Sequence, residues 1–156
     1  MKFFVDQNLG SLIKWLRFLG FDVVQMKLTP KDPHSLPILK RNNFIVTRQT
    51  SSPEKLKRPD LIVLASERTE SQLAEICRRL NLSPETWVPL IRCSTCNKIL
   101  QPIPADQADG RVPDFTSQKQ RQFFECPQCR RVFWEGSHQS RIRQQLQKLQ
   151  DDILGQ

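Results

Sequence analysis

The sequence predicts an α/β protein whose central parallel sheet is flanked by helices and is followed by a small cysteine-built module and a C-terminal helix. Three observations predict this class. Short apolar runs alternate with helical patterns over residues 1 to about 90, which is the order found in parallel sheets covered by helices. Two Cys-x-x-Cys pairs then occur where apolar periodicity is sparse. Residues 139–154 carry apolar side chains at helical spacing.

The first strand, helix and second strand are expected at the N-terminus. Phe3-Phe4-Val5 is apolar throughout, as strands buried on both faces are. Apolar residues at helical spacing from Leu9 to Leu19 predict a helix, and Gly20 follows where a helix C-cap is expected. Val23-Val24 predicts the second strand.

The sequence patterns that predict the remaining elements of this region are weaker, except for the pattern of the last strand. They are, in order, a weak helix at 35–40, a strand at 44–47, a polar loop at 48–59 and a clear strand at 61–65. Thr69 followed by Gln72 has the spacing of a capping box, which predicts the start of a further helix. That helix carries one apolar stripe, formed by Leu73, Ile76, Cys77 and Leu80. We expect three parts: 1–88 for the α/β domain, 89–138 for the cysteine module and 139–156 for the C-terminal helix and tail.

The chain is basic, with 24 Lys and Arg residues against 16 Asp and Glu, a formal net charge of +8. The excess is spread along the chain, and a diffuse basic surface attracts polyanions such as nucleic acid. No apolar run approaches the ~18 residues that cross a bilayer. The N-terminal segment Met1–Asp6 meets a charge too early for a signal peptide. We therefore expect a cytoplasmic protein without a membrane partner.

The cysteines give the most specific pattern. Cys93 and Cys96 form one pair, and Cys126 and Cys129 form the other. Each pair fits a tight turn that aims two thiolates at one point, and four thiolates form a closed tetrahedral site typical of structural zinc. Iron in a rubredoxin-like site and two redox-active pairs are the alternatives. Cys77 is expected to be a small core residue.

Two groups of N-terminal residues are candidates for function. Asp6 ends the first strand, where functional residues of parallel sheets gather, so it is a candidate carboxylate for Mg²⁺ or Mn²⁺. Its alternative role is to cap the helix that follows. Lys14 and Arg17 share a helix face and flank Trp15, which suits nucleic-acid binding. The alternative is a solvated face with Trp15 in the core.

Several motifs occur together in one order along the chain. They are Phe4-Val5-Asp6, Leu9-Gly10, Leu12, Trp15-Leu16-Arg17, Leu19-Gly20, Asp22, Ile45-Val46-Thr47-Arg48, Arg92-Cys93-x-x-Cys96-Asn97, Arg111-Val112-Pro113, Phe123-x-x-Cys126-Pro127-x-Cys129 and Val132-Phe133-Trp134-x-Gly136-Ser137-His138. From about residue 1 to 143, this order closely resembles the Mut-seven C-terminal RNase-domain family. That family joins a PIN-like nuclease domain to a four-cysteine zinc ribbon.

The resemblance implies a metal-dependent RNase ancestry and a set of site residues. The acids that it implies for catalysis are Asp6, Asp22, Asp32 and Glu67. The family normally has Asp after the Thr-Arg dipeptide, and here that position is Gln49, whose amide brings no charge to a Mg²⁺ or Mn²⁺ site. The residues expected to contact RNA are Lys14, Trp15, Arg17, Arg48, Arg111, Arg130, Arg131 and His138.

Gln49 leaves two functions open. The chain is either a working ribonuclease with a weakened metal site, or an inactive domain that retains RNA binding or serves as an adaptor. RNA is the expected partner, and DNA remains an option. The C-terminal stripe of Ile142, Leu146, Leu149 and Ile153 is expected either to dock on a protein partner or second copy, or to pack on its own chain.

Overall fold

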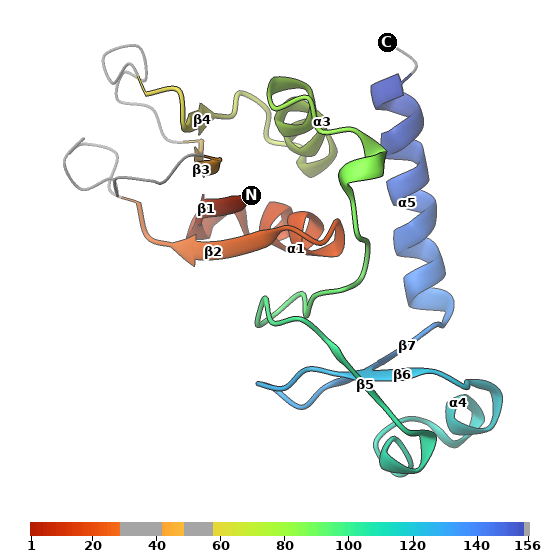
Figure 1. Cartoon of the computed structure of the whole chain (residues 1–156). Helices are drawn as coiled ribbons and strands as arrows, with labels where there is room; N and C mark the ends of the chain where they lie inside the picture. Colours follow the sequence, from red (N-terminus) through yellow and green to blue (C-terminus); the bar gives the residue numbers. More distant parts are fainter. Residues whose placement is uncertain (29–41, 49–57, 155–156) are drawn as a thin grey trace.

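The fold is known from a computed structural model that describes residues 1–28, 42–48 and 58–154 (Figure 1). Within the last helix, the side chains of 137–139 and 152–154 lie outside the description. The weak helix expected at 35–40 and most of the loop expected at 48–59 also fall outside the described residues.

The first sheet has four parallel strands, β1 (Lys2–Asp6), β2 (Asp22–Met26), β3 (Asn43–Thr47) and β4 (Leu61–Val63). Their spatial order is β2-β1-β3-β4, so the first strand lies inside the sheet between its two partners. This confirms the predicted parallel sheet, although the fourth strand is shorter than expected. Because all four strands run in the same direction, their carboxyl ends lie along one edge of the sheet. Asp6, the last residue of β1, lies at this carboxyl edge.

Two helices cover one face of this sheet. A 3₁₀ turn, η1 (Gln7–Leu9), leads into α1 (Gly10–Phe18), and α3 (Thr69–Arg79) follows β4. The odd-numbered residues Phe3 and Val5 of β1 are fully buried beneath these helices, as period-two alternation requires. The helical stripe residues Leu12, Leu16 and Ile76 complete this core.

The start of α3 differs from the prediction. Arg68 occupies the N-cap position without a side-chain cap, so the predicted capping box of Thr69 and Gln72 is wrong. Thr69 has already entered the helix, and the Gln72 side-chain amide donates instead to the carbonyl of Ser66 at 2.9 Å. This bond ties the β4–α3 loop, which carries Glu67, to the first turn of the helix.

A second, antiparallel sheet holds the C-terminal module. Its strands β5 (Gln101–Ile103), β6 (Phe123–Glu125) and β7 (Val132–Trp134) lie in the order β5-β6-β7. Two short helical elements accompany it, η4 (Ala105–Gln107) and α4 (Asp114–Lys119), whereas the turn η3 (Pro84–Thr86) follows α3 and precedes the module. Its two cores are small, one around the cysteines and one around Phe123. Apolar packing alone therefore gives this module little stability.

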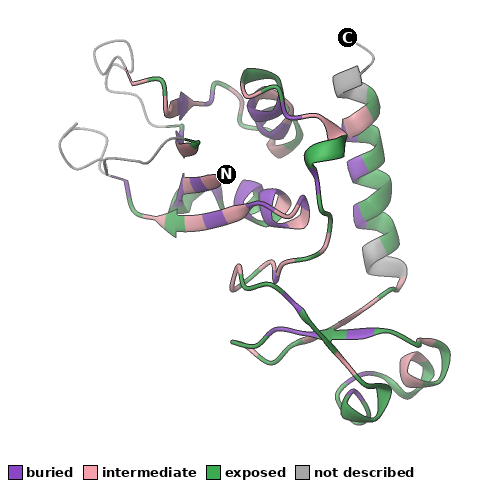
Figure 2. Cartoon of the chain, in the orientation of Figure 1, coloured by how far each residue is buried: buried purple, intermediate pink, exposed green. Residues whose placement is uncertain are grey.

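The last helix, α5 (Ser137–Leu154), returns from the second sheet to the first domain (Figure 1). Its residues Ile142, Leu146 and Leu149 are buried in the same core as α1 and α3. Figure 2 shows buried positions along α5 among mostly exposed ones. The stripe therefore packs on its own chain, and these three residues are not free to dock a partner. The side chain of Ile153 lies outside the description.

Gly20 closes α1 as the sequence predicts, and its surroundings exclude a larger residue. Its φ is +94°, and a Cβ there would lie 2.4 Å from the carbonyl oxygen of Val88. We expect Gly20→Ala to lower the free energy of unfolding by about 1–3 kcal/mol, because it adds both backbone strain and a steric clash. Urea denaturation measures this loss. Gly10→Ala is the matched control, since nothing lies within 4 Å of its added methyl group; equal stability of the two variants contradicts the assignment.

Candidate metal centre and candidate active site

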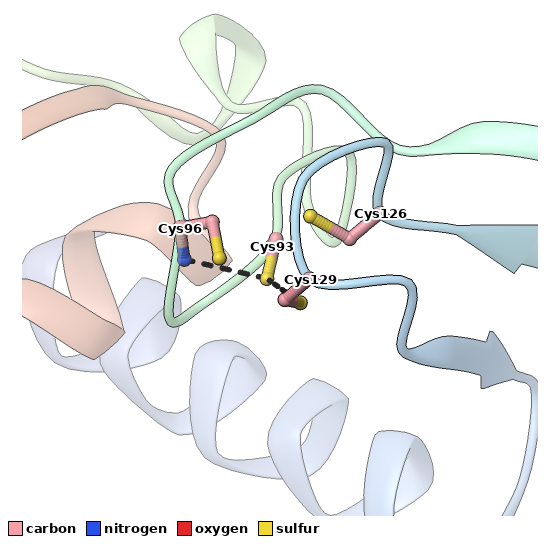
Figure 3. Close-up of side chains that lie close together, drawn as sticks. All are labelled: Cys93, Cys96, Cys126 and Cys129. Atoms are coloured by element: carbon pink, nitrogen blue, oxygen red, sulfur yellow. Dashed lines mark hydrogen bonds between the residues drawn. The ribbon is translucent and has the colours of Figure 1, made fainter.

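The four predicted cysteine ligands converge on one point between two loops (Figure 3). Their sulfur atoms all lie within 4.8 Å of one another, and the Sγ atoms of Cys93 and Cys129 are 3.8 Å apart. A tetrahedron with Zn–S bonds of about 2.3 Å has sulfur–sulfur edges of about 3.8 Å. The arrangement therefore fits a zinc ion held by four protein ligands, with no position left for water or substrate, as is typical of structural zinc sites.

The two cysteine loops have the same backbone hydrogen bonds. The N–H of Asn97 donates to the carbonyl of Cys93 at 2.9 Å, and that of Arg130 donates to the carbonyl of Cys126 at 2.9 Å. Both donors have a positive φ, 64° for Asn97 and 62° for Arg130. Asparagine tolerates this left-handed conformation, whereas arginine adopts it at a cost. The second loop therefore holds a strained residue directly after its second cysteine.

The thiol environments differ within the cluster. The pKa of Cys96 is raised to about 12, first by burial and then by its interaction with Cys129 and the charge of Cys93. Burial also raises the pKa of Cys129, but hydrogen bonds from the Arg131 backbone and from the other thiols outweigh it and lower the value to about 7. Because thiolates are the metal ligands, binding of the ion displaces the thiol protons, and metal affinity falls as the pH is lowered.

Arg17 holds the first cysteine loop against the α/β domain. Its Nη1 atom donates to the carbonyls of Ser94 at 2.8 Å and Thr95 at 2.7 Å, and Nη2 donates to the carbonyl of Val23 at 2.9 Å. Burial lowers the pKa of Arg17, while the nearby charges of Cys93, Cys96 and Asp22 raise it. The guanidinium thus also places a positive charge beside two of the thiolates.

Asn97 makes the second connection between the cysteine loop and the sheet. Its side-chain oxygen accepts from the N–H of Val23 at 3.0 Å, and its Nδ2 atom donates to Asp22 Oδ1 at 2.6 Å. Arg92 adds a third, from its Nε atom to the carbonyl of Gly20 at 3.0 Å. Together these contacts attach the first cysteine loop to the end of α1 and the start of β2.

These positions bear on two of the sequence predictions. Asp22 is paired with Lys2 at the amino end of the sheet, four residues along β1 from Asp6. At a rise of about 3.3 Å per residue, this places the two residues about 13 Å apart along the strands, so the register separates Asp22 from Asp6. Arg17 is 6% exposed and its two Nη atoms donate to three carbonyls, which leaves it little surface for the predicted RNA contact.

Asp6 lies where the sequence predicts, at the carboxyl edge of the sheet, and it is 2% exposed. Its Oδ2 atom accepts from the hydroxyl of Thr47 at 3.2 Å, and its Oδ1 atom accepts from the backbone N–H of Asn8 at 3.3 Å. The second bond is the N-cap of η1, so the alternative capping role of Asp6 is present too. A cavity of about 270 Å³ opens beside it, lined by Asp6, Asn8, Leu9 and Arg48.

Glu67 is connected to this cavity through an ion pair. Its Oε1 atom lies 2.6 Å from Nη2 of Arg48, one of the lining residues. Asp32 and Gln49 lie outside the described residues. Within the described ranges, the cysteine cluster is the only group of three or more neighbouring metal-ligating side chains.

The other predicted RNA contacts fall into different environments. Arg111 and Arg130 both pair with the buried carboxylate of Glu125, at 2.5 Å and 2.6 Å. Arg131 donates to the hydroxyl of Thr95 at 3.1 Å. Lys14 is exposed, whereas Trp15 is half-buried with its ring edge-on to Phe18 at 5.5 Å. The side chain of His138 lies outside the description.

Sequence reasoning missed four side chains of these sites: Thr47, Asn8, Asn97 and Glu125. Thr47 and Asn97 belong to motifs that carry the family resemblance, so their place in those motifs was a usable signal. The Asn8 contact follows from its position two residues after Asp6, since an N-cap side chain accepts from the backbone N–H at that spacing. No local sequence pattern predicts the role of Glu125, because its partners Arg111 and Arg130 lie outside its own strand.

These features define a class of protein, namely an α/β domain with a four-stranded parallel sheet, a buried aspartate at its carboxyl edge and a docked four-cysteine centre. The family model of the Mut7-C RNase domain matches residues 1–146. The chain belongs to the Mut7-C RNase domain family, which confirms the resemblance carried by the motifs. Membership implies an interaction with nucleic acid.

No curated protein and no solved structure matches the chain. In the described ranges, no helix combines the length and the apolar character needed to cross a membrane.

Proposed function

We propose that this protein is a metal-dependent ribonuclease that hydrolyses phosphodiester bonds at the carboxyl edge of its parallel sheet. The observation that supports this function best is Asp6, a buried carboxylate that opens onto a cavity and is oriented by Thr47. Burying a carboxylate costs free energy that a bound cation offsets, which supports a role for Asp6 in binding a cation.

The residues at this edge suit Mg²⁺ or Mn²⁺. Among the described residues, each Asp6 oxygen accepts one long hydrogen bond, and a carboxylate oxygen has a second lone pair to offer. Mg²⁺ is typically held by one or two carboxylates, together with waters and substrate phosphate. Asp6 would hold the ion, which when bound would stabilise charge on the phosphate and lower the pKa of attacking water.

The chain's own groups have separate roles in this proposal. Thr47 donates to one Asp6 oxygen and so helps to fix the orientation of the carboxylate beside the cavity. Arg48 lines the cavity and offers a cation to the phosphate, and Glu67 holds that guanidinium in place. The buried setting of Asp6 excludes competing water from its inner oxygen.

RNA binding without turnover is the second candidate. Glu67 is engaged by Arg48, Asp22 lies at the opposite edge, and Gln49 replaces an expected acid. Each of these lowers the negative charge available to a divalent ion, and metal affinity depends on that charge.

Cleavage of labelled RNA with Mg²⁺ or Mn²⁺ tests the proposal. We expect Asp6→Asn to lower the cleavage rate more than about 100-fold, and Thr47→Val to lower it about 10- to 100-fold, the usual range for residues that orient a metal ligand. Gln49→Asp should raise the rate, because it restores a negative ligand.

The comparison distinguishes the two candidates. Cleavage only by Gln49→Asp supports RNA binding without turnover. Cleavage by the wild type that survives Asp6→Asn contradicts the placement of the site. Arg121→Met, at an exposed residue outside the cavity, serves as a control for nonspecific loss of charge.

A further inference from the structure

We propose that a groove between α1, α3 and α5 is a binding site for one base of single-stranded RNA. This inference rests on the proposed function, because it places substrate beside the same edge of the sheet. The groove has a volume of about 340 Å³ and is lined by residues of all three helices. None of the sequence motifs points to this combination, since its parts lie about 50 to 80 residues apart in the chain.

The floor of the groove is apolar and contains an aromatic ring. Leu73 and Leu146 are buried, and Trp15 between them is only half-buried. Phe18 meets the Trp15 ring edge-on, with centroids 5.5 Å apart and planes at 79°, which limits the motion of the indole. A fixed, partly open indole is a stacking platform for a base, and such stacking tolerates any base because each has a π-face.

The rim carries charges that fit a nucleotide better than a free anion or an apolar ligand. Arg68 and Lys148 contribute two cations, and Glu70 contributes one carboxylate. Among the described residues, neither cation has an ion-pair partner within 4.0 Å. A neutral base suits the interior, while its flanking phosphates suit the cations; the carboxylate repels a phosphate from its side and accepts from base N–H groups.

The size and position of the groove agree with this occupant. Its volume is at the lower end for small-ligand pockets, which suits a single ring system. Arg68 directly follows Glu67, and Glu67 pairs with Arg48 in the Asp6 cavity. A base in the groove therefore places its neighbouring phosphodiester next to the proposed site of hydrolysis.

Fluorescence anisotropy with a labelled single-stranded oligonucleotide, in zinc-loaded protein without added Mg²⁺, tests binding separately from cleavage. We expect Trp15→Leu and Lys148→Glu each to weaken binding about tenfold, with Trp15→Phe close to the wild type because a ring remains. Lys148 is exposed, so its substitution is safe for folding. The matched control is Arg121→Glu, an exposed charge reversal outside the groove.

Each outcome decides the question. If the groove variants lose oligonucleotide binding while Arg121→Glu keeps it, the groove is supported as the base-binding site, whether or not the protein cleaves RNA. Equal weakening by Arg121→Glu indicates diffuse electrostatic attraction and overturns the proposal. Unchanged oligonucleotide binding by Lys148→Glu and by Trp15→Leu, the latter shown to be folded, also overturns the proposal. A peptide would then be the better occupant of the groove.

Discussion

Replacing Cys96 with serine is expected to abolish stable zinc binding and to unfold the C-terminal module. Structural zinc in comparable peptides contributes about 10–16 kcal/mol of apparent binding free energy, which is also folding free energy. The two small cores of this module, around the cysteines and around Phe123, are too limited to replace it. A zinc-release assay gives the metal content, and hydrogen exchange over β5–β7 shows whether the module remains folded.

Cys77→Ser is the matched control for this result. Cys77 is a buried thiol in the core of the α/β domain, and burial raises its pKa to about 12, so it is not a ligand or a nucleophile. This variant should keep one zinc per chain, with only modest loss of stability. Full zinc content and unchanged melting of Cys96→Ser are the results that contradict a structural four-cysteine centre.

Replacing Arg17 with methionine is expected to have the second-largest effect, a loss of about 3 kcal/mol in the free energy of unfolding. The variant removes three hydrogen bonds from a buried charged donor and leaves the carbonyls of Ser94, Thr95 and Val23 without it. Hydrogen bonds to charged groups contribute about 1.5–3 kcal/mol each, and they are not additive within one network. Urea denaturation measures the loss.

Zinc should also dissociate faster from Arg17→Met, because the first cysteine loop loses its attachment and its neighbouring positive charge. Lys14→Met is the control, since Lys14 is exposed on the same helix and surface substitutions usually change stability by no more than about 0.5 kcal/mol. Equal stability of the two variants would mean that Arg17 does not hold the modules together.

Local patterns in the sequence were sufficient for most of the described fold. The apolar runs at Phe3-Phe4-Val5 and 44–47 predict strands because burial on both faces leaves no polar alternation. The stripe of α5 is equally clear, since Ile142, Leu146 and Leu149 recur at helical spacing. The cysteine spacing predicts the metal centre because ligand chemistry leaves few other uses for two such pairs.

The active-site predictions depended on longer-range information. Asp22 was placed with Asp6 because both belong to family motifs, but their separation follows from the parallel register of β1 and β2. Arg17 shares a helix with Lys14, yet its long side chain turns toward the cysteine loop, and no local pattern records such a partner. Likewise, the sequence shows that Arg111 and Arg130 are charged but not which residue they pair with. Only the fold brings both of them to Glu125.

The central claim is that Asp6 binds the divalent ion used for RNA hydrolysis. Anomalous diffraction from crystals of the protein soaked in Mn²⁺, compared with crystals of Asp6→Asn, tests it most directly. We expect a manganese peak at coordination distance from an Asp6 carboxylate oxygen in the wild type and none there in the variant, with zinc at the four cysteines in both. Manganese bound away from Asp6, or retained at that edge in Asp6→Asn, would contradict the account.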